Sequence, residues 1–315
     1  MVNIFYKSTE KVLLHQGIQG LDDLLNEEVI WVDLIAPSPI ERDSIEKFFN
    51  ITLQTQQEIE EIEISSRYFE TQDVIIANTQ FLILGENDFR KESVSFIIKE
   101  KMLFSYRYAE MRTFNDMYRR LDYHYRIIDG VQIFLTLLEI RIDLDADMIE
   151  NVVKDISAIS TLVIREKHMD EEMLVKISNY QELTMMLREN VIDKQRVISS
   201  IMKSEYFPPE HQNKLRIMVK DTSSILDYTS FSFQRLDFLQ NSFVGFVNIE
   251  QNKIIKIFTV ATVVFMPPTL IASIYGMNFK FLPETQWTYG YPFAIVLMII
   301  ASLGTVYFFK KKKWL

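Results

Sequence analysis

Two long runs without a charged residue, close to the end of the chain, constrain the fold more than any other feature of the sequence. The first covers residues 257–274, and with residues 275–277 it reaches the ~20 positions that a helix needs to cross ~30 Å of hydrocarbon. The second covers residues 291–309. Only residues 278–290 separate the two runs, so the sequence predicts a hairpin of two membrane-spanning helices.

Lysines at the two ends of this hairpin predict its orientation. Lys253 and Lys256 precede the first run and four lysines at 310–313 follow the second, whereas the connection holds only Lys280 against Glu284. Positively charged residues are retained on the cytoplasmic side of membrane helices. We therefore expect both termini in the cytoplasm, in a multi-pass protein of the inner (cytoplasmic) membrane that has the lipid bilayer as a partner. Two buried helices of a soluble core are the alternative, and the lysine block argues against it.

The composition excludes several classes of protein. The 315 residues carry a net charge of -9 and no basic stripe, which argues against a nucleic-acid partner. The absence of cysteine excludes a disulfide framework, thiol catalysis and cysteine-ligated zinc. The four histidines lack metal-ligand spacing, and no phosphate-binding loop or nucleophile elbow occurs. We therefore expect neither an enzyme nor a resident cofactor.

One face of the first predicted span carries hydroxyl groups. Its side chains recur at intervals of three and four residues, at Thr259, Thr262, Met266, Thr269 and Ser273. This face is a candidate lining for an aqueous path, although small hydroxyl residues also serve close packing between membrane helices. Prolines at 267 and 268 each remove a backbone donor, so the carbonyl groups that they free need another donor. Two helices cannot enclose a path, and a pore therefore requires several copies of the chain.

The residues before the spans predict an α+β organisation. Short β-branched or aromatic runs in the first third predict strands, and Ser38 with Glu41 predicts a capping box at the start of a helix between them, which is typical of an α/β layer domain. The strand runs are residues 2–6, 29–34, 74–76, 79–84, 93–98 and 102–106. From about residue 110 the pattern is helical, with possible breaks at Gly130 and at the proline pair 208–209.

The last helical stretch, residues 210–275, runs into the membrane without a linker, as one stalk of ~100 Å. A coiled-coil spacer is the alternative, but no strict heptad holds across residues 223–252. The predicted segments are an α/β domain (1–125), a helical hairpin (126–207), the stalk (208–256), a pore-lining span (257–277), an outer loop (278–290), a second span (291–309) and a basic cytoplasmic tail (310–315).

A motif at the end of the first span points to a known family. Tyr275, Gly276, Met277, Asn278 and Phe279 follow the apolar run. Gly-Met-Asn in this position is the signature of the CorA family of magnesium channels, which the sequence strongly resembles. Further matches are Met266-Pro267, Pro283-Glu284, Trp287, Gly290-Tyr291-Pro292 and the closing residues 310–315. The resemblance implies a homopentamer that takes up magnesium, with cobalt or nickel as further ions, through a pore surrounded by an outer ring of second spans.

The resemblance also implies roles for individual residues. Gly276, Met277 and Asn278 would form the selectivity filter, where a ring of amide oxygens accepts hydrogen bonds from hydrated Mg2+ without trapping the ion. Phe258 and Met266 fall where hydrophobic rings gate by dewetting. Counted without gaps from the motif, the pore positions are Asn252, Phe258, Met266, Thr269 and Ser273.

Regulation is where the sequence departs from the family pattern. Members sense cytoplasmic magnesium through carboxylates at subunit interfaces, so that Mg2+ is a regulatory ligand as well as the substrate. The same count places an expected stalk aspartate at Ile217. Asp221 and Asp227 are near enough to replace it, and Asp88 or the acidic residues of 58–63 are candidates to face them.

The sequence is also compatible with two other functions. A zinc transporter of the same superfamily would share the hairpin and the stalk, and Met277 favours the magnesium branch. A membrane-anchored scaffold would need neither the hydroxyl stripe nor the asparagine at the pore mouth.

Overall fold

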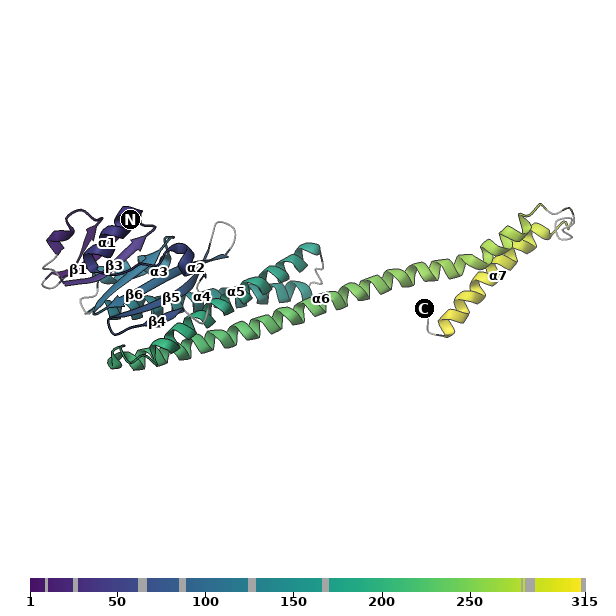
Figure 1. The fold of residues 1–315 in the computed structure, drawn as a ribbon. Coiled ribbons are helices and arrows are strands. Elements are labelled where there is room, and N and C mark those ends of the chain that lie inside the picture. The colour runs from purple at the N-terminus through teal and green to yellow at the C-terminus, as the bar shows by residue number, and fades with distance from the viewer. Residues whose placement is uncertain are drawn as a thin grey trace. The chain divides into compact units, whose positions relative to one another are not determined.

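The computed structural model describes residues 1–8, 11–24, 28–61, 67–84, 89–123, 129–165, 170–278, 280 and 287–312. The chain forms two compact units, Met1–Leu239 and Gln240–Leu315, and the long helix α6 (Gln212–Tyr275) contributes to both (Figure 1). The other elements are β1 (Val2–Ser8), β2 (Lys11–Gln16), η1 (Leu21–Leu24), β3 (Glu28–Ile35), α1 (Pro39–Phe49), α2 (Gln56–Glu61), β4 (Tyr68–Glu70), β5 (Val74–Leu84), β6 (Phe89–Lys99), β7 (Met102–Arg107), α3 (Arg112–Tyr123), α4 (Gly130–Ile164), α5 (Glu171–Ile201), η3 (Pro209–His211) and α7 (Gly290–Lys311).

The first unit is built on a seven-stranded sheet of order β2-β1-β3-β7-β6-β5-β4. Only β3 and β7 pair in parallel among the described strands, and their neighbours are antiparallel. All six predicted strand runs are confirmed, although residues 74–76 and 79–84 belong to one strand, β5. The edge strands β2 and β4 were missed, because β2 is largely exposed and β4 has three residues, so neither shows a clear apolar alternation.

Helices cover both faces of this sheet because successive side chains of a strand point to opposite sides. On one face, Ile97 packs in a cluster with Ile45 of α1. On the other face, the adjacent Phe96 stacks on Phe114 of α3 and meets Phe134 of α4 edge-on, with ring centroids 6.4 and 5.2 Å apart. The predicted α/β layer domain is therefore confirmed.

The start of α1 confirms the predicted capping box. The backbone N–H of Ser38 donates to Oε2 of Glu41 at 2.8 Å, and the N–H of Glu41 donates to the Ser38 hydroxyl at 3.3 Å. These two bonds satisfy donors that the first turn of a helix leaves free.

Gly130 starts α4 at the point where the helix meets the sheet. A Cβ there would lie 2.3 Å from the backbone nitrogen of Leu103 and 2.6 Å from the carbonyl oxygen of Ile30. The Gly130 N–H donates to the carbonyl of Lys101 at 2.7 Å, and Asp129 caps the helix. The glycine therefore marks the beginning of α4 rather than a break within it, because only a residue without a side chain fits this contact.

A buried charge network fastens α5 to α4 and to β5. The ammonium of Lys194 lies 3.1 Å from Asp145, and it donates to Asn190 Oδ1 at 2.6 Å and to the Gln80 carbonyl at 3.1 Å. Arg141 also binds Asp145. Burial lowers the pKa of Lys194 to about 8, although the Asp145 carboxylate opposes this shift.

In the first unit, α6 is joined to α4 and α5 by side-chain hydrogen bonds. Gln195 of α5 donates to the Ser223 hydroxyl at 2.8 Å, and Arg235 of α6 donates to the Ser157 hydroxyl of α4 at 2.9 Å. The prediction of one long helix after the proline pair is confirmed, since α6 has 64 residues and follows the single turn η3.

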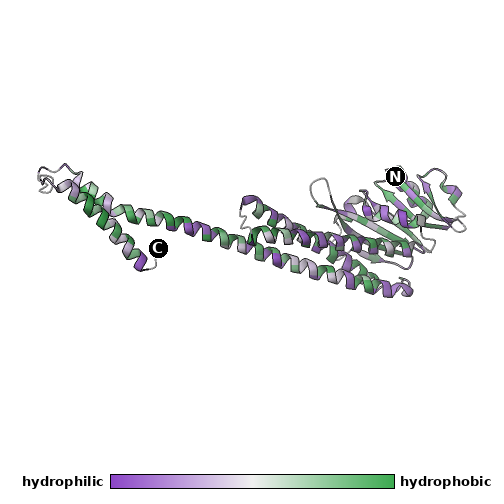
Figure 2. Cartoon of the chain, turned by 180° about the vertical axis from the view of Figure 1, so that it is seen from behind, coloured by the Kyte–Doolittle hydropathy of each residue, from purple (hydrophilic) through white to green (hydrophobic). Residues whose placement is uncertain are grey.

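The second unit consists of the final part of α6 and helix α7. Both helices are long and apolar enough to cross a membrane, with windows of mean hydropathy 1.9 and 2.1. Figure 2 shows this apolar character along α7 and along the part of α6 that lies beside it. Because these windows are almost entirely exposed in the single chain, their apolar side chains require a bilayer or further copies of the chain around them.

Candidate ion pathway

The predicted pore residues of α6 share one side of the helix. At ~100° per residue, Asn252, Phe258, Thr259, Thr262, Met266, Thr269 and Ser273 fall within an arc of ~120°. All seven are exposed in the single chain. The partly covered residues of the span, such as Val264, Pro268 and Ile271, lie on a roughly opposite arc, which faces α7. The structure thus places the predicted residues on one side of α6, and α7 approaches only the edge of that side, at Asn252 and Thr259.

The hydroxyl groups of this face are oriented by the helix that carries them. Thr259 donates to the Ile255 carbonyl at 2.8 Å, Thr262 to the Phe258 carbonyl at 2.9 Å and Thr269 to the Phe265 carbonyl at 2.7 Å. Each O–H is used within the helix, so the oxygen keeps its lone pairs as an acceptor. An exposed row of acceptors suits a hydrated cation, whose waters present their hydrogens.

The proline pair does not interrupt α6, which is helical on both sides of it. Pro268 cannot donate to the carbonyl of Val264, four residues earlier. The Ser302 hydroxyl of α7 donates to that carbonyl at 3.1 Å instead. The expectation that a freed carbonyl needs another donor is confirmed at this position, and the bond fixes which side of α6 lies against α7.

The Gly-Met-Asn residues follow directly on the last turn of α6. The Gly276 N–H donates to the Ala272 carbonyl at 2.8 Å, and the Met277 N–H donates to the Ile274 carbonyl at 3.3 Å. A Cβ on Gly276 would lie 3.1 Å from the Ala272 oxygen. Glycine is therefore favoured here by the limited space, and not by a left-handed backbone conformation. Met277 and Asn278 are exposed.

Two bulky apolar side chains stand among the polar ones on the same arc. Phe258 is 69% exposed and Met266 is 62% exposed. Such exposure is costly for large apolar groups in water, so this face is a candidate for a narrow or membrane-enclosed environment.

Comparisons with known proteins identify the family of this chain. Residues 26–311 match the family described as CorA-like Mg2+ transporter protein. The chain belongs to this family. The resemblance to the family is therefore confirmed, and membership in it indicates that the apolar end of α6 and helix α7 lie in a membrane.

Relatives of the CorA-like family match along the whole chain. The magnesium transport protein CorA of Wolinella succinogenes is 40% identical over 322 residues, which is 100% of both chains. The complete structure of the CorA magnesium transporter from Methanocaldococcus jannaschii has a TM-score of 0.84 at 17% identity, covering 100% of this chain and 99% of that one. The cytoplasmic domain of ZntB from Vibrio parahaemolyticus has a TM-score of 0.58 at 15% identity, covering 79% and 98%. The likeness to the complete CorA structure confirms the predicted fold class.

The acidic residues expected to regulate a CorA-like channel are only partly placed. Asp88 lies outside the described residues. Asp221 and Asp227 are exposed on α6, and so is Ile217. Glu58, from the acidic run, accepts a hydrogen bond from the Thr55 N–H at 2.6 Å and so caps α2. Within the described ranges, no group of three or more acidic or histidine side chains converges as a metal site.

An acidic stripe on α4 that faces α6 was not predicted from the sequence. The stripe consists of Glu139, Asp143 and Asp147, spaced by four residues on one side of the helix. Although Asp143 reaches solvent, partial burial raises its pKa and the carboxylates of Glu139, Asp147 and Asp221 raise it further, while the Arg120 guanidinium opposes this shift. The spacing of four is visible in the sequence, but only the structure shows that Asp221 lies near the stripe.

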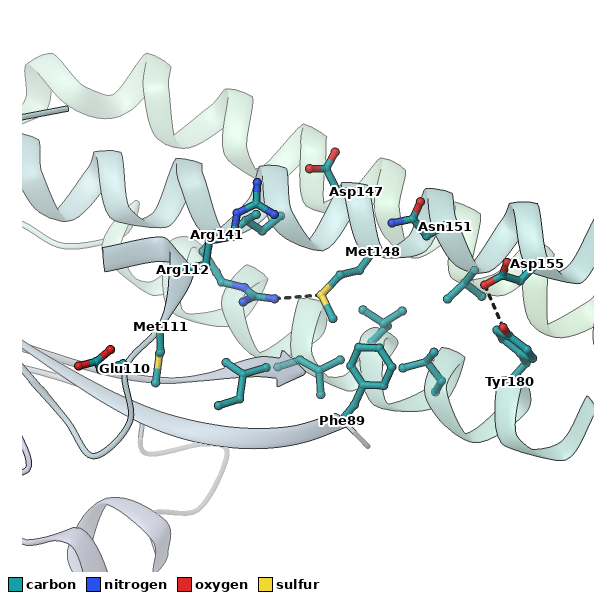
Figure 3. A pocket seen from close by; sticks show the side chains of 16 residues that line it. Phe89, Glu110, Met111, Arg112, Arg141, Asp147, Met148, Asn151, Asp155 and Tyr180 are labelled. Carbon is teal, nitrogen blue, oxygen red and sulfur yellow. Dashed lines mark hydrogen bonds between the residues drawn. The ribbon is translucent and has the colours of Figure 1, made fainter. Parts of the chain in front are cut away.

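A hollow of about 540 Å3 between β5, β6, α4 and α5 lies beside this stripe (Figure 3). Its floor is apolar, with Phe89 among the residues that the view labels. Tyr180 closes one end by donating to Asp155 at 2.9 Å, and Arg141 at the other end contacts the sulfur of Met148 at 3.4 Å. Its polar groups are thus partly bonded to one another, and they do not form a carboxylate cage.

Proposed function

We propose that this chain is the subunit of a homo-oligomeric channel that carries magnesium into the cell. The observation that carries the proposal is the row of outward-facing hydroxyl oxygens on α6, on the side away from α7 and ending at Asn278. Curated relatives that are 34–40% identical along their whole length bear the name magnesium transport protein. The cation is the substrate of the protein, and catalysis of a covalent reaction is not proposed.

Self-association follows from the surfaces that the single chain leaves open. One α6 helix with α7 on one side cannot surround an ion, so the hydroxyl faces of several copies must meet. Tyr228, Phe231 and Phe238 are 57–59% exposed on the part of α6 that precedes the membrane. These aromatic residues recur at intervals of three and seven on one side of the helix, as an interface between stalks requires. We take the assembly to be a pentamer, as the resemblance implies.

The ring of Asn278 side chains would select the ion at the outer mouth. Mg2+ releases its waters reluctantly and prefers oxygen ligands. Neutral amide oxygens accept hydrogen bonds from those waters, whereas a carboxylate ring would hold the ion more tightly and release it more slowly. Cobalt and nickel would pass by the same contacts, since both are small hydrated divalent ions.

Gating would use Phe258 and Met266 inside the pore and carboxylates outside it. A narrow ring of apolar side chains can exclude water and so stop a hydrated ion. Divalent ions bound near Asp221 and the acidic stripe of α4 would screen repulsion between these carboxylates. Loss of those ions at low magnesium would shift the population towards an open state.

The orientation follows from charge. Lysines before α6 enters the membrane and after α7 support a cytoplasmic position for residues 1–256 and the tail 310–315, with the connection 278–290 outside. A negative interior then favours cation entry by ~2.3 kcal/mol per charge per 100 mV. We assign the protein to the inner membrane.

The test is divalent uptake by liposomes that contain the purified protein and a magnesium-sensitive dye. Asn278→Ala should lower the initial rate at least tenfold, whereas Asn115→Ala, a change of an exposed asparagine in α3, should leave it unchanged. Vesicles that stay dark for magnesium but admit zinc would favour a zinc transporter. Vesicles that admit neither ion at low internal magnesium would contradict the channel.

A further inference from the structure

A small cavity lies between α6 and α7 near the lysine-bearing ends of the two helices. Its volume is about 230 Å3. In Figure 1, α7 lies close to α6 near Gly290 and diverges from it towards the chain end. The walls include Val260, Val263, Val264, Thr305, Val306 and Phe309. The cavity thus belongs to the second unit and lies between the two helices, where Asn252 and Thr259 of the predicted pore face also line it.

The walls of this cavity are mostly apolar, although Asn252, Thr259 and Thr305 also line it. Thr305 donates its hydroxyl hydrogen to the Ala301 carbonyl at 2.7 Å, and Thr259 donates to the Ile255 carbonyl at 2.8 Å. Both hydroxyl hydrogens are therefore used within their own helices, and the threonine methyl groups add to the apolar surface. Aliphatic chains fill such a space well, because each buried methylene contributes ~0.8 kcal/mol.

One cation stands at the edge of the cavity. Lys256 is the single charged residue among the described residues that line it. Within the described part of the chain, no carboxylate forms an ion pair with Lys256, whereas Lys253 pairs with Glu250 at 3.7 Å. Lys310 and Lys311 end α7 and add positive charge at the same end of the unit.

We propose that this cavity holds an acyl chain of an anionic membrane phospholipid whose phosphate pairs with Lys256. Basic pockets between membrane helices bind anionic headgroups, and Lys256 lies directly before the uncharged run, where a phosphate of the bilayer would lie. The proposal requires only that α6 and α7 lie in a bilayer, and it does not depend on which ion the protein conducts.

The charges favour a lipid over a second copy of the chain as the occupant. Glu250 and Glu284 are the only acidic residues in 240–315, and Glu250 already pairs with Lys253. The membrane unit of a second copy therefore brings no free carboxylate to this level, since Glu284 belongs to the connection at the other end of the spans. A phospholipid supplies both the anion and the apolar chain.

Native mass spectrometry of the detergent-purified full chain tests the proposal, with phosphatidylglycerol and phosphatidylcholine as probes. The wild type should retain phosphatidylglycerol preferentially. Lys256→Gln should weaken phosphatidylglycerol binding about fivefold and leave phosphatidylcholine unchanged. Lys253→Gln is the matched control and should not change either lipid. Equal binding of both lipids, or an equal loss in the two lysine variants, would overturn the proposal.

A second measurement locates the lipid without depending on a variant. Phosphatidylglycerol with a photoreactive acyl chain should label residues 255–264 and 305–309, and Val306→Trp, which fills the cavity, should remove that labelling. Labelling spread evenly over the outward-facing residues of α7 would contradict a defined site. The chain has no cysteine, so Val306→Cys would introduce its only thiol. Disulfide formation between copies at Val306→Cys would instead assign the cavity to a second subunit.

Discussion

The hydroxyl group of Ser302 on α7 donates a 3.1 Å hydrogen bond to the carbonyl oxygen of Val264 on α6, the carbonyl that Pro268 leaves without its helical partner. The bond joins the two spans at the place where the proline pair weakens the first. It also turns most of the hydroxyl face of α6 away from α7. The carbonyl group that the proline leaves unpaired thus forms a contact between the two helices, and this contact sets which side of α6 faces α7.

Ser302→Ala should destabilise the membrane unit by ~1 kcal/mol, a typical value for a hydrogen bond between membrane helices. Thermal unfolding of the detergent-purified protein measures the change. In a Pro268→Ala background the restored N–H can take the Val264 carbonyl, so Ser302→Ala should then cost much less. Equal losses in the two backgrounds would show that the bond does not serve the proline.

Gly130→Ala should destabilise the first unit by ~1–3 kcal/mol or more, because a Cβ would meet three backbone atoms within 2.7 Å. Urea unfolding followed by circular dichroism measures the loss. Gly245→Ala in α6 is the control, since a Cβ there meets nothing within 4 Å, and it should stabilise the helix by ~0.5–1 kcal/mol. A neutral Gly130→Ala would contradict the close contact with β7.

Lys194→Met should cost ~3–5 kcal/mol, because it breaks a buried ion pair with Asp145. The exposed Lys176→Met should be nearly neutral by comparison.

The same residue should affect the pH dependence of stability. The pKa of Lys194 is about 8 in the folded state against 10.5 when exposed. Between these two pH values the unfolded chain binds more protons at Lys194 than the folded chain does. The contribution of Lys194 to the free energy of unfolding therefore increases as the pH rises. The wild type should gain stability relative to Lys194→Met between pH 8 and 10, and a parallel pH profile would contradict the lowered pKa.

Asp143→Asn should raise the unfolding temperature at pH 7 by ~1–2 °C, because it removes repulsion with like-charged neighbours four residues away. Because the pKa of Asp143 is raised above its ordinary value of 3.8 in the folded state, the free energy of unfolding falls as the pH rises above 3.8. At lower pH the carboxyl group is protonated in both states, so the stability gain of Asp143→Asn should vanish. Asp73→Asn, in the exposed turn before β5, is the control.

Asp143→Asn also tests regulation. If the acidic stripe binds magnesium, the variant should show a smaller increase in unfolding temperature on addition of Mg2+ than the wild type. An unchanged increase would exclude Asp143 from the regulatory site.

Phe258→Ala should increase magnesium uptake at high internal magnesium, because a smaller side chain lets water remain in the constriction. Phe308→Ala is a matched control, since Phe308 is exposed on α7 and lies outside the predicted pore face. The rate of magnesium uptake into liposomes is measured for both variants. A rate for Phe258→Ala equal to that of the wild type would show that Phe258 is not part of the gate.

The sequence by itself determined the two spans, the capping box of Ser38 and Glu41, the long α6 and the hydroxyl spacing on it. Each of these features depends on residues near one another along the chain, where periodicity, capping chemistry and hydropathy act locally. The family motif at residues 276–278 was equally local. The short edge strands β2 and β4 were not predicted from the sequence, because pairing with neighbouring strands, and not their own composition, makes them strands.

Only the tertiary structure decided which side of α6 meets α7, that Ser302 replaces the donor lost at Pro268, and that Asp221 faces an acidic stripe 74 to 82 residues earlier in the chain. It also decided that Gly130 presses on backbone atoms of β3 and β7. These relationships join residues far apart in sequence, and they arise because packed helices and strands leave one favourable arrangement of their surfaces. The residue spacing within a single segment does not predict this arrangement.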